Sequence, residues 1–155
     1  MSIARSSPRM RWLVISLVLV LLAAALYAAS LLLTHYAVDD FVGDLRLEGA
    51  TVEFPPESTN LDVFPASGYR IKVNGEHVDV YEFVDVLQAW RAVRAVGPDG
   101  SSISPSQGII GLDIEWVMPP HWYHKGQLIV LYVGENSNLK ATLAKLLGAE
   151  FARPE

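Results

Sequence analysis

YRIKVNGEHVDVYEF, residues 69–83, carries the clearest structural pattern in this chain. At its centre, Asn74-Gly75 lies between two runs in which apolar and polar residues alternate. This dipeptide favours a two-residue turn because both residues tolerate positive φ, and such a turn fixes the register of the strands. The predicted pairs are Val73 with Glu76, Ile71 with Val78, Tyr69 with Val80, Lys72 with His77 and Arg70 with Asp79. The sequence therefore predicts a hairpin with one mostly apolar face and an opposite-charge pair on the other.

Two elements are expected before this hairpin. Residues 38–48 carry apolar side chains at helical spacing and are followed by Gly49, which predicts a helix. The predicted inward-facing residues of this helix are Val38, Phe41, Val42 and Leu45. Residues 50–54 alternate and predict a short strand, whereas residues 55–67 have little periodicity and indicate a loop.

Four elements are expected after the hairpin. Asp85 is the predicted N-cap of a helix that ends at the turn residues 97–100. The predicted inner residues of this helix are Val86, Trp90, Val93 and Gly97, with Leu87 beside them. Alternation over residues 113–118 predicts a strand, and the unbroken apolar run over residues 128–133 predicts a central strand that is buried on both faces. Leu residues at helical spacing predict a last helix, with Ser137 or Asn138 as its N-cap and Gly148 at its end.

These elements follow one another in the order α-β-ββ-α-β-β-α over residues 35–155. Strand pairs separated by helices favour an α+β domain, with the helices packed on one face of a largely antiparallel sheet. The chain contains no Cys. A disulfide framework, a thiolate metal site and a Cys nucleophile are therefore excluded.

The N-terminal region predicts a membrane anchor. Residues 12–34, WLVISLVLVLLAAALYAASLLLT, carry no charge and are long enough to cross a hydrocarbon core as a helix. Arg5, Arg9 and Arg11 precede this run, so we expect residues 1–11 in the cytoplasm and the following domain outside the cell membrane. The expected protein is single-pass and contacts the lipid bilayer through its transmembrane helix. A cleaved signal peptide is the alternative, but the apolar run continues beyond the small residues that a peptidase would need.

The segment from residue 35 onward is acidic, with nine Lys and Arg residues against 17 Asp and Glu residues. A nucleic-acid-binding protein needs a basic face that neutralises phosphates, so we expect no nucleic-acid partner. The same balance disfavours a peripheral contact between the domain and anionic lipid headgroups.

The most unusual local composition is HWYH, residues 121–124, which follows Pro119-Pro120. Aromatic side chains are enriched at interfaces, and packing at the edge of the core is the alternative for them. The candidate residues for binding a partner or a ligand are Trp116, His121, Trp122, Tyr123 and His124.

Two imidazoles also suggest a metal site. A zinc or copper site needs three or four converging ligands, and His77 is a potential third ligand. His121 and His124 would point to opposite faces of a strand, although they could converge on a turn. We favour a bend that carries packed aromatic rings over a metal site.

The sequence contains no motif of a catalytic or cofactor-binding site that rises above background, so we expect no cofactor and favour a non-enzymatic role. The expected function is that of a binding or accessory module for an envelope partner. One alternative is a metal-binding protein or metal-dependent enzyme that uses His121 and His124. Another is a carrier of small ligands, which would need a pocket beside Trp116 and Tyr123.

One extended motif runs from Trp116 through Pro119-Pro120-His121, Tyr123 and Lys125-Gly126 to LIVLYVG at residues 128–134. Shorter motifs accompany it: LR at 45–46 with GATVE at 49–53, VNG at 73–75 with VYE at 80–82, and PDGS at 98–101. Together they resemble a set of small bacterial envelope proteins of uncharacterised activity, many of which are lipoproteins. This chain has no Cys for a lipid, so a helix would replace the lipid anchor. The resemblance implies a location in the bacterial envelope, but no activity or substrate.

Overall fold

The computed structural model describes residues 16–23, 35–55, 63–104 and 111–153. Residues 35–155 form one compact unit and residues 1–34 another, and each is considered by itself. Residues 16–23 are helical, whereas the rest of the predicted span 12–34 lies outside the described residues. Within the described part of the chain, no helix is both long enough and apolar enough to cross a membrane.

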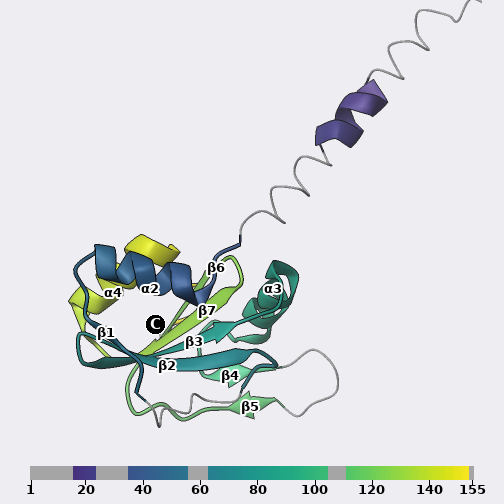
Figure 1. Ribbon diagram of the computed structural model, residues 1–155. Helices are drawn as coiled ribbons and strands as arrows, with labels where there is room; N and C mark the ends of the chain where they lie inside the picture. Colours follow the sequence, from purple (N-terminus) through teal and green to yellow (C-terminus); the bar gives the residue numbers. More distant parts are fainter. Residues whose placement is uncertain (1–15, 24–34, 56–62, 105–110, 154–155) are drawn as a thin grey trace, which may run out of the picture. The chain divides into compact units, whose positions relative to one another are not determined.

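Residues 35–155 fold as an α+β domain on a five-stranded antiparallel sheet, as the sequence predicts (Figure 1). The elements in chain order are α2 (Val38–Leu47), β1 (Val52–Glu53), β2 (Ser67–Val73), β3 (Glu76–Glu82), α3 (Val86–Ala95), β4 (Ser102–Ile103), β5 (Leu112–Asp113), β6 (Pro120–Lys125), β7 (Leu128–Val133) and α4 (Ser137–Leu147). The strand order across the sheet is β1-β2-β3-β7-β6, and β4 pairs with β5 in a separate small sheet. β7 is therefore a central strand, as its unbroken apolar run predicts.

The hairpin of β2 and β3 has the predicted register at every pair. The turn residues Asn74 and Gly75 have φ values of 51° and 88°, which is the backbone that this two-residue turn requires. Arg70 Nε lies 2.7 Å from Oδ1 of Asp79, and the second guanidinium nitrogen donates to Oδ2 at 2.9 Å. Asp79 is only 6% exposed, so this two-pronged ion pair compensates for the loss of water around its charge.

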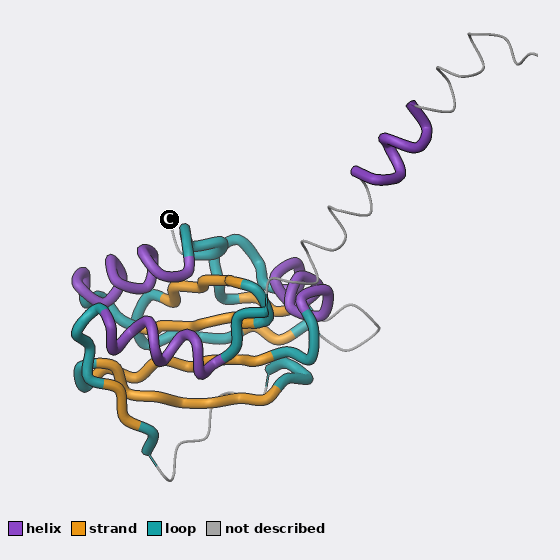
Figure 2. Tube along the Cα trace, turned by 45° about the horizontal axis from the view of Figure 1, so that its top comes forward, coloured by secondary structure: helices purple, strands orange, loops and turns teal. Residues whose placement is uncertain are grey.

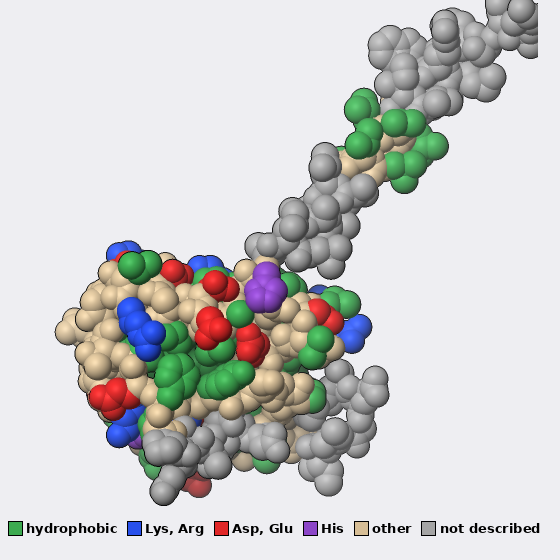
Figure 3. Space-filling model, viewed as in Figure 1, with side chains coloured by type: hydrophobic (Ala, Val, Ile, Leu, Met, Phe, Trp, Pro, Cys, Tyr) green, Lys and Arg blue, Asp and Glu red, His purple; other side chains and the backbone are tan. Residues whose placement is uncertain are grey.

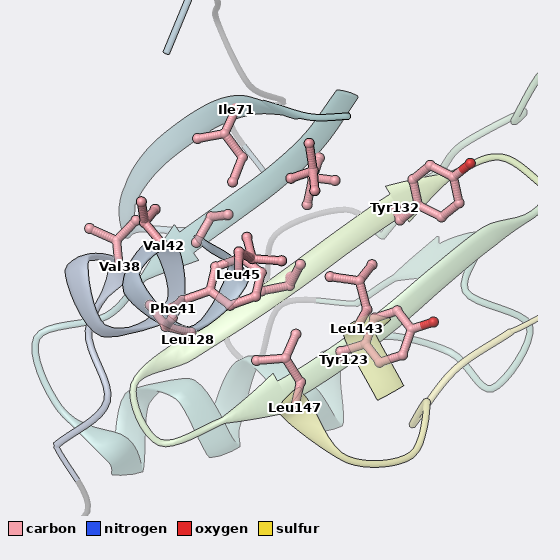
Figure 4. Close-up of a cluster of buried hydrophobic side chains, with 14 of the residues drawn as sticks. Val38, Phe41, Val42, Leu45, Ile71, Tyr123, Leu128, Tyr132, Leu143 and Leu147 are labelled. Carbon is pink, nitrogen blue, oxygen red and sulfur yellow. The ribbon is translucent and has the colours of Figure 1, made fainter. Parts of the chain in front are cut away.

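One face of the sheet is covered by α2 and α4 (Figure 2). The apolar stripe of α2 is buried as predicted, and α4 adds the Leu residues of its own stripe. Figure 4 shows how these side chains meet the sheet. The helical members of this cluster are Val38, Phe41, Val42, Leu45, Leu139, Leu143 and Leu147. Each fully buried Leu, Val or Phe contributes roughly 1.5–3 kcal/mol, so this layer is a major source of stability.

The expectation that the helices pack on one face of the sheet is wrong, because α3 packs on the opposite face. The inner strands carry apolar side chains on both faces, as with Val80 and Tyr81 in β3. Val80 belongs to the cluster under α2 and α4, whereas Tyr81 belongs to the cluster under α3. A sheet that is apolar on both faces needs cover on both.

The predicted inner side of α3 is also wrong in part. Ala89 and Ala92 are the buried residues of this helix, whereas Trp90 is 45% exposed. The small Ala side chains let the helix backbone approach the large aromatic rings beneath it. The predicted N-cap is confirmed, since the Asp85 side chain accepts a hydrogen bond from the backbone N–H of Gln88.

The predicted strand at residues 113–118 is wrong. Only Leu112 and Asp113 are extended in a ladder, and they pair with β4 outside the main sheet. The fifth strand is instead β6, which begins at Pro120 and pairs with β7. A proline fits there because the first residue of an edge strand need not donate a ladder hydrogen bond.

Candidate functional site

β6 carries four of the five candidate residues and separates them by the alternation of a strand. The pairs across to β7 are His121 with Tyr132, Trp122 with Leu131, Tyr123 with Val130 and His124 with Ile129. Val130 and Tyr132 belong to the cluster under α2 and α4, whereas Ile129 and Leu131 belong to the cluster under α3. His121 and Tyr123 therefore lie on one face, and Trp122 and His124 lie on the other.

On the α4 face, a single carboxylate joins the two polar side chains. The Tyr123 hydroxyl donates to Oε1 of Glu150 at 3.0 Å, and Nδ1 of His121 lies 3.1 Å from Oε2. The His121 ring also stacks on Tyr132, with the ring centroids 6.1 Å apart. Because an ionised carboxylate can only accept, His121 donates from Nδ1 in this arrangement.

The electrostatics of this cluster keep the carboxyl group charged. Burial by itself raises the pKa of Glu150, but the hydrogen bonds from His121 and Tyr123 outweigh it, and the pKa lies below its usual value. Burial, followed by the hydrogen bond to Glu150, raises the pKa of the Tyr123 hydroxyl. Glu150 is therefore ionised and Tyr123 neutral at neutral pH.

The segment that carries Glu150 is attached to the outer edge of β6. The Trp122 backbone N–H donates to the carbonyl of Ala152 at 3.1 Å, and the Phe151 N–H donates to the carbonyl of Trp122 at 2.9 Å. Arg153 N–H donates to the carbonyl of Pro98 at 3.0 Å. The C-terminal segment thereby satisfies backbone groups that an edge strand would otherwise expose.

The pair of His121 and Glu150 resembles the imidazole–carboxylate pairs that orient a general base. However, His121 is only 7% exposed, and its Nε2 has no hydrogen-bond partner among the described residues. A substrate has no access to a ring that is buried in this way. The cluster is therefore a polar support for the core and for the C-terminal segment.

On the α3 face, Trp122 is fully buried. Its indole N–H donates to the carbonyl of Gly100 at 3.0 Å, and the indole of Trp116 donates to the same oxygen at 3.0 Å. Gly100 has φ +72°, and a Cβ there would lie 2.8 Å from Cδ1 of Trp122. Glycine is therefore required where this turn meets the ring.

This burial corrects the hypothesis that Trp122 and Tyr123 present a surface to a partner. Both side chains are 0% exposed and form part of the core. Trp116 is half-buried against Trp122, with their ring centroids 6.3 Å apart. The alternative of core packing therefore describes these aromatic residues.

His124 lies at the base of α3, where its ring centroid is 4.8 Å from that of Trp90. Burial lowers the pKa of His124, although the hydrogen bond to the carbonyl of Gly126 acts in the opposite direction. His121 and His124 lie on opposite faces of β6, so the structure does not bring the two candidate metal ligands together. His77 is at the turn end of β3, and the described residues contain no group of three potential ligands that could hold a metal ion.

An open groove of about 540 Å³ lies at the ends of β2 and β3. Its lining residues are Phe64, Pro65, Ala66, Ser67, Glu82, Phe83 and Val84. Neither Trp116 nor Tyr123 lines this groove, so it is not the pocket that a small-ligand carrier would need beside those residues.

Exposed apolar side chains gather in two places, the first of which adjoins this groove at Val84. The first is the α3 surface, which we define as Val84, Leu87 and Trp90, with exposed fractions of 81%, 61% and 45%. The second is the distal segment, residues 112–118, where Leu112, Val117 and Met118 are 47%, 96% and 43% exposed. Sequence reasoning missed the first because Trp90 was assigned to the inner side of its helix, and it missed the second because residues 113–118 were predicted to form a strand. The spacing of Ala89 and Ala92 was the available signal for the true inner side of α3.

In the comparisons with known proteins, no family model, no curated protein and no solved structure matches this chain significantly.

Proposed function

We propose that this chain is a membrane-anchored, extracytoplasmic module without catalytic activity that binds a partner in the bacterial envelope. The observation that carries this proposal is the distal segment. It holds a nearly fully exposed Val117 beside a partly exposed Met118. Two large apolar side chains that are exposed at adjacent positions favour a protein contact there.

The distal segment is held in place by fixed contacts. Trp116 donates its indole N–H to Gly100, and the Ile114 N–H donates to the carbonyl of Ser101 at 2.8 Å. At the other side, the Gly134 N–H donates to the carbonyl of Pro119 at 3.1 Å. A preordered segment loses little conformational entropy on binding, which favours a contact role.

The membrane location is supported by composition. Residues 12–34 contain no charge, and Arg5, Arg9 and Arg11 precede them. Residues 16–23 are helical, and the side chains of residues 17–22 are all apolar and exposed. A helix that is apolar all around favours a membrane span. The resemblance to small envelope proteins favours the same location.

The experiment places a photocrosslinking amino acid at Val117 in cells that make the full chain. We expect a discrete adduct with an envelope protein, and we expect Met118→Glu to abolish it because a charge would be buried in the contact. Leu47 is the matched control, since it is apolar and 85% exposed but lies at the end of α2. Absence of an adduct at Val117, or the same adducts from Leu47, would contradict the proposal.

A further inference from the structure

Several contacts show which part of the domain lies next to residues 35–38, which follow the proposed anchor. Nζ of Lys125 lies 3.9 Å from the ring centroid of Tyr36, and the Val38 N–H donates to Oε1 of Glu82 at 3.2 Å. The turn between β6 and β7 and the last residue of β3 are therefore at the same end as residues 35–38. We call this the proximal end.

The α3 surface lies at this proximal end. Nε2 of Gln127, in the turn between β6 and β7, donates to the carbonyl of Val84 at 2.8 Å. The Phe83 N–H donates to the carbonyl of Gln127 at 3.0 Å. Trp90 in turn packs on His124, next to the same turn. The exposed apolar side chains of the α3 surface and residues 35–38 are therefore placed around one turn.

Two cations accompany the apolar residues. Arg91 and Arg94 are both exposed on α3, and they lie four residues beyond Leu87 and Trp90, respectively. Figure 3 shows hydrophobic and basic side chains together, with an acidic one among them, at the right-hand edge where Figure 1 places α3. The local composition thus differs from the acidic average of the domain, on which the expectation against a lipid contact was based.

We propose that the α3 surface rests on the lipid bilayer in which residues 12–34 are anchored, an inference that depends on the proposed membrane location. If the span ends at residue 34 as proposed, only residues 35–37 connect it to α2, and three residues reach about 10 Å at most. The proximal end is therefore held beside the bilayer. A tether this short gives the surface a high local concentration at the headgroups, so a weak contact is sufficient.

The chemistry of the surface fits the interfacial region of a bilayer. Trp is enriched at the headgroup level because its ring is apolar and its N–H is polar. Leu87 and Val84 would bury apolar area among the acyl chains, and Arg91 and Arg94 can reach lipid phosphates. Asp39 and Asp85 are also exposed at this end, and they repel anionic headgroups. We therefore expect the apolar side chains to contribute more to lipid binding than the two Arg residues do.

The test uses the full chain in lipid nanodiscs. The chain has no Cys, so Leu87→Cys and Val117→Cys each provide one attachment site for an environment-sensitive fluorophore. Val117 is the matched control because it is exposed and apolar but lies before β6, at the far end of the strands from the proximal turn. Two lipid compositions are compared: phosphatidylcholine alone, and phosphatidylethanolamine with phosphatidylglycerol. In both, some of the lipids carry a quencher on the headgroup or on the acyl chain.

We expect a blue shift and lipid-dependent quenching at Leu87 in both lipid compositions, stronger with phosphatidylglycerol, and neither effect at Val117. Equal signals at the two positions would overturn the lipid contact. An unchanged thermal unfolding midpoint shows that each labelled variant is folded. Failure of the proposed anchoring has a different signature, because the protein would then elute apart from the nanodiscs.

Discussion

At the scale of single residues, Glu150 is the acceptor that holds His121 and Tyr123 in the core. Glu150→Ala leaves a buried imidazole and a buried hydroxyl without their acceptor, and each unpaired buried group costs about 1–3 kcal/mol. We therefore expect a clear loss in the free energy of unfolding, measured by urea unfolding of a fragment of residues 35–155. Glu115→Ala, which removes an exposed carboxylate, is the control and should change it little.

His124 gives the domain a pH-dependent stability. Burial lowers its pKa, so the folded state binds a proton less readily than the unfolded state does. The unfolded pKa is about 6.5, and stability should fall as the pH drops from there toward the folded value. His124→Gln should weaken this decline, as measured by urea unfolding at a series of pH values. A decline of equal size in the variant would assign it to other groups.

The sequence could predict part of this residue-level arrangement. The separation of His121 and His124 follows from the period of two, once residues 120–125 are known to be a strand. Glu150 could not be found in this way, since it lies 29 residues from His121 and meets it only through the fold. No local pattern marks such a contact.

At the scale of elements, β6 packs closely against the turn at Gly100 because glycine has no side chain. Gly100→Ala places a methyl group against Trp122, in addition to the strain of positive φ. Gly49→Ala is the matched control, because Gly49 also has positive φ but has nothing within 4 Å of the added Cβ. We expect Gly100→Ala to lower the free energy of unfolding by about 1–3 kcal/mol more than Gly49→Ala does. Equal losses would show that Trp122 does not need this space.

The core beneath α3 and the exposed side of α3 should differ in their importance for folding. Trp122→Ala removes a fully buried ring and should cost about 3–5 kcal/mol. Leu87→Ala on the exposed side of α3 should stay within about 0.5 kcal/mol of the original protein. Thermal or urea unfolding of the two variants measures both values. A small effect of Trp122→Ala would restore the possibility that this ring serves a contact.

Sequence patterns predicted elements whose signals are local. The hairpin turn at Asn74-Gly75 and the stripe of α2 are confirmed, because each depends on residues that are close along the chain. β6 was missed because Pro119-Pro120 resembles the end of a strand, and only the sheet shows that Pro120 begins an edge. The inner side of α3 was missed because packing against large rings favours small residues over the largest ones.

At the scale of the whole molecule, the domain has two exposed apolar surfaces, near opposite ends of β6. The α3 surface lies at the proximal end, and the distal segment precedes Pro120. Six strand residues separate the two ends by about 20 Å. In the proposed topology the proximal end rests on the bilayer, which leaves the distal segment accessible to a partner.

The proposed membrane topology can be measured by single-Cys labelling, because the chain has no Cys of its own. Ser6→Cys reports on residues 1–11, and Leu47→Cys reports on an 85% exposed position of the domain. A membrane-impermeant maleimide should label Leu47→Cys in intact cells, and Ser6→Cys only after the membrane is opened, with both variants in the membrane fraction. Protection of Leu47→Cys in intact cells, or its release as a soluble protein, would show that the domain is not anchored outside the cell membrane.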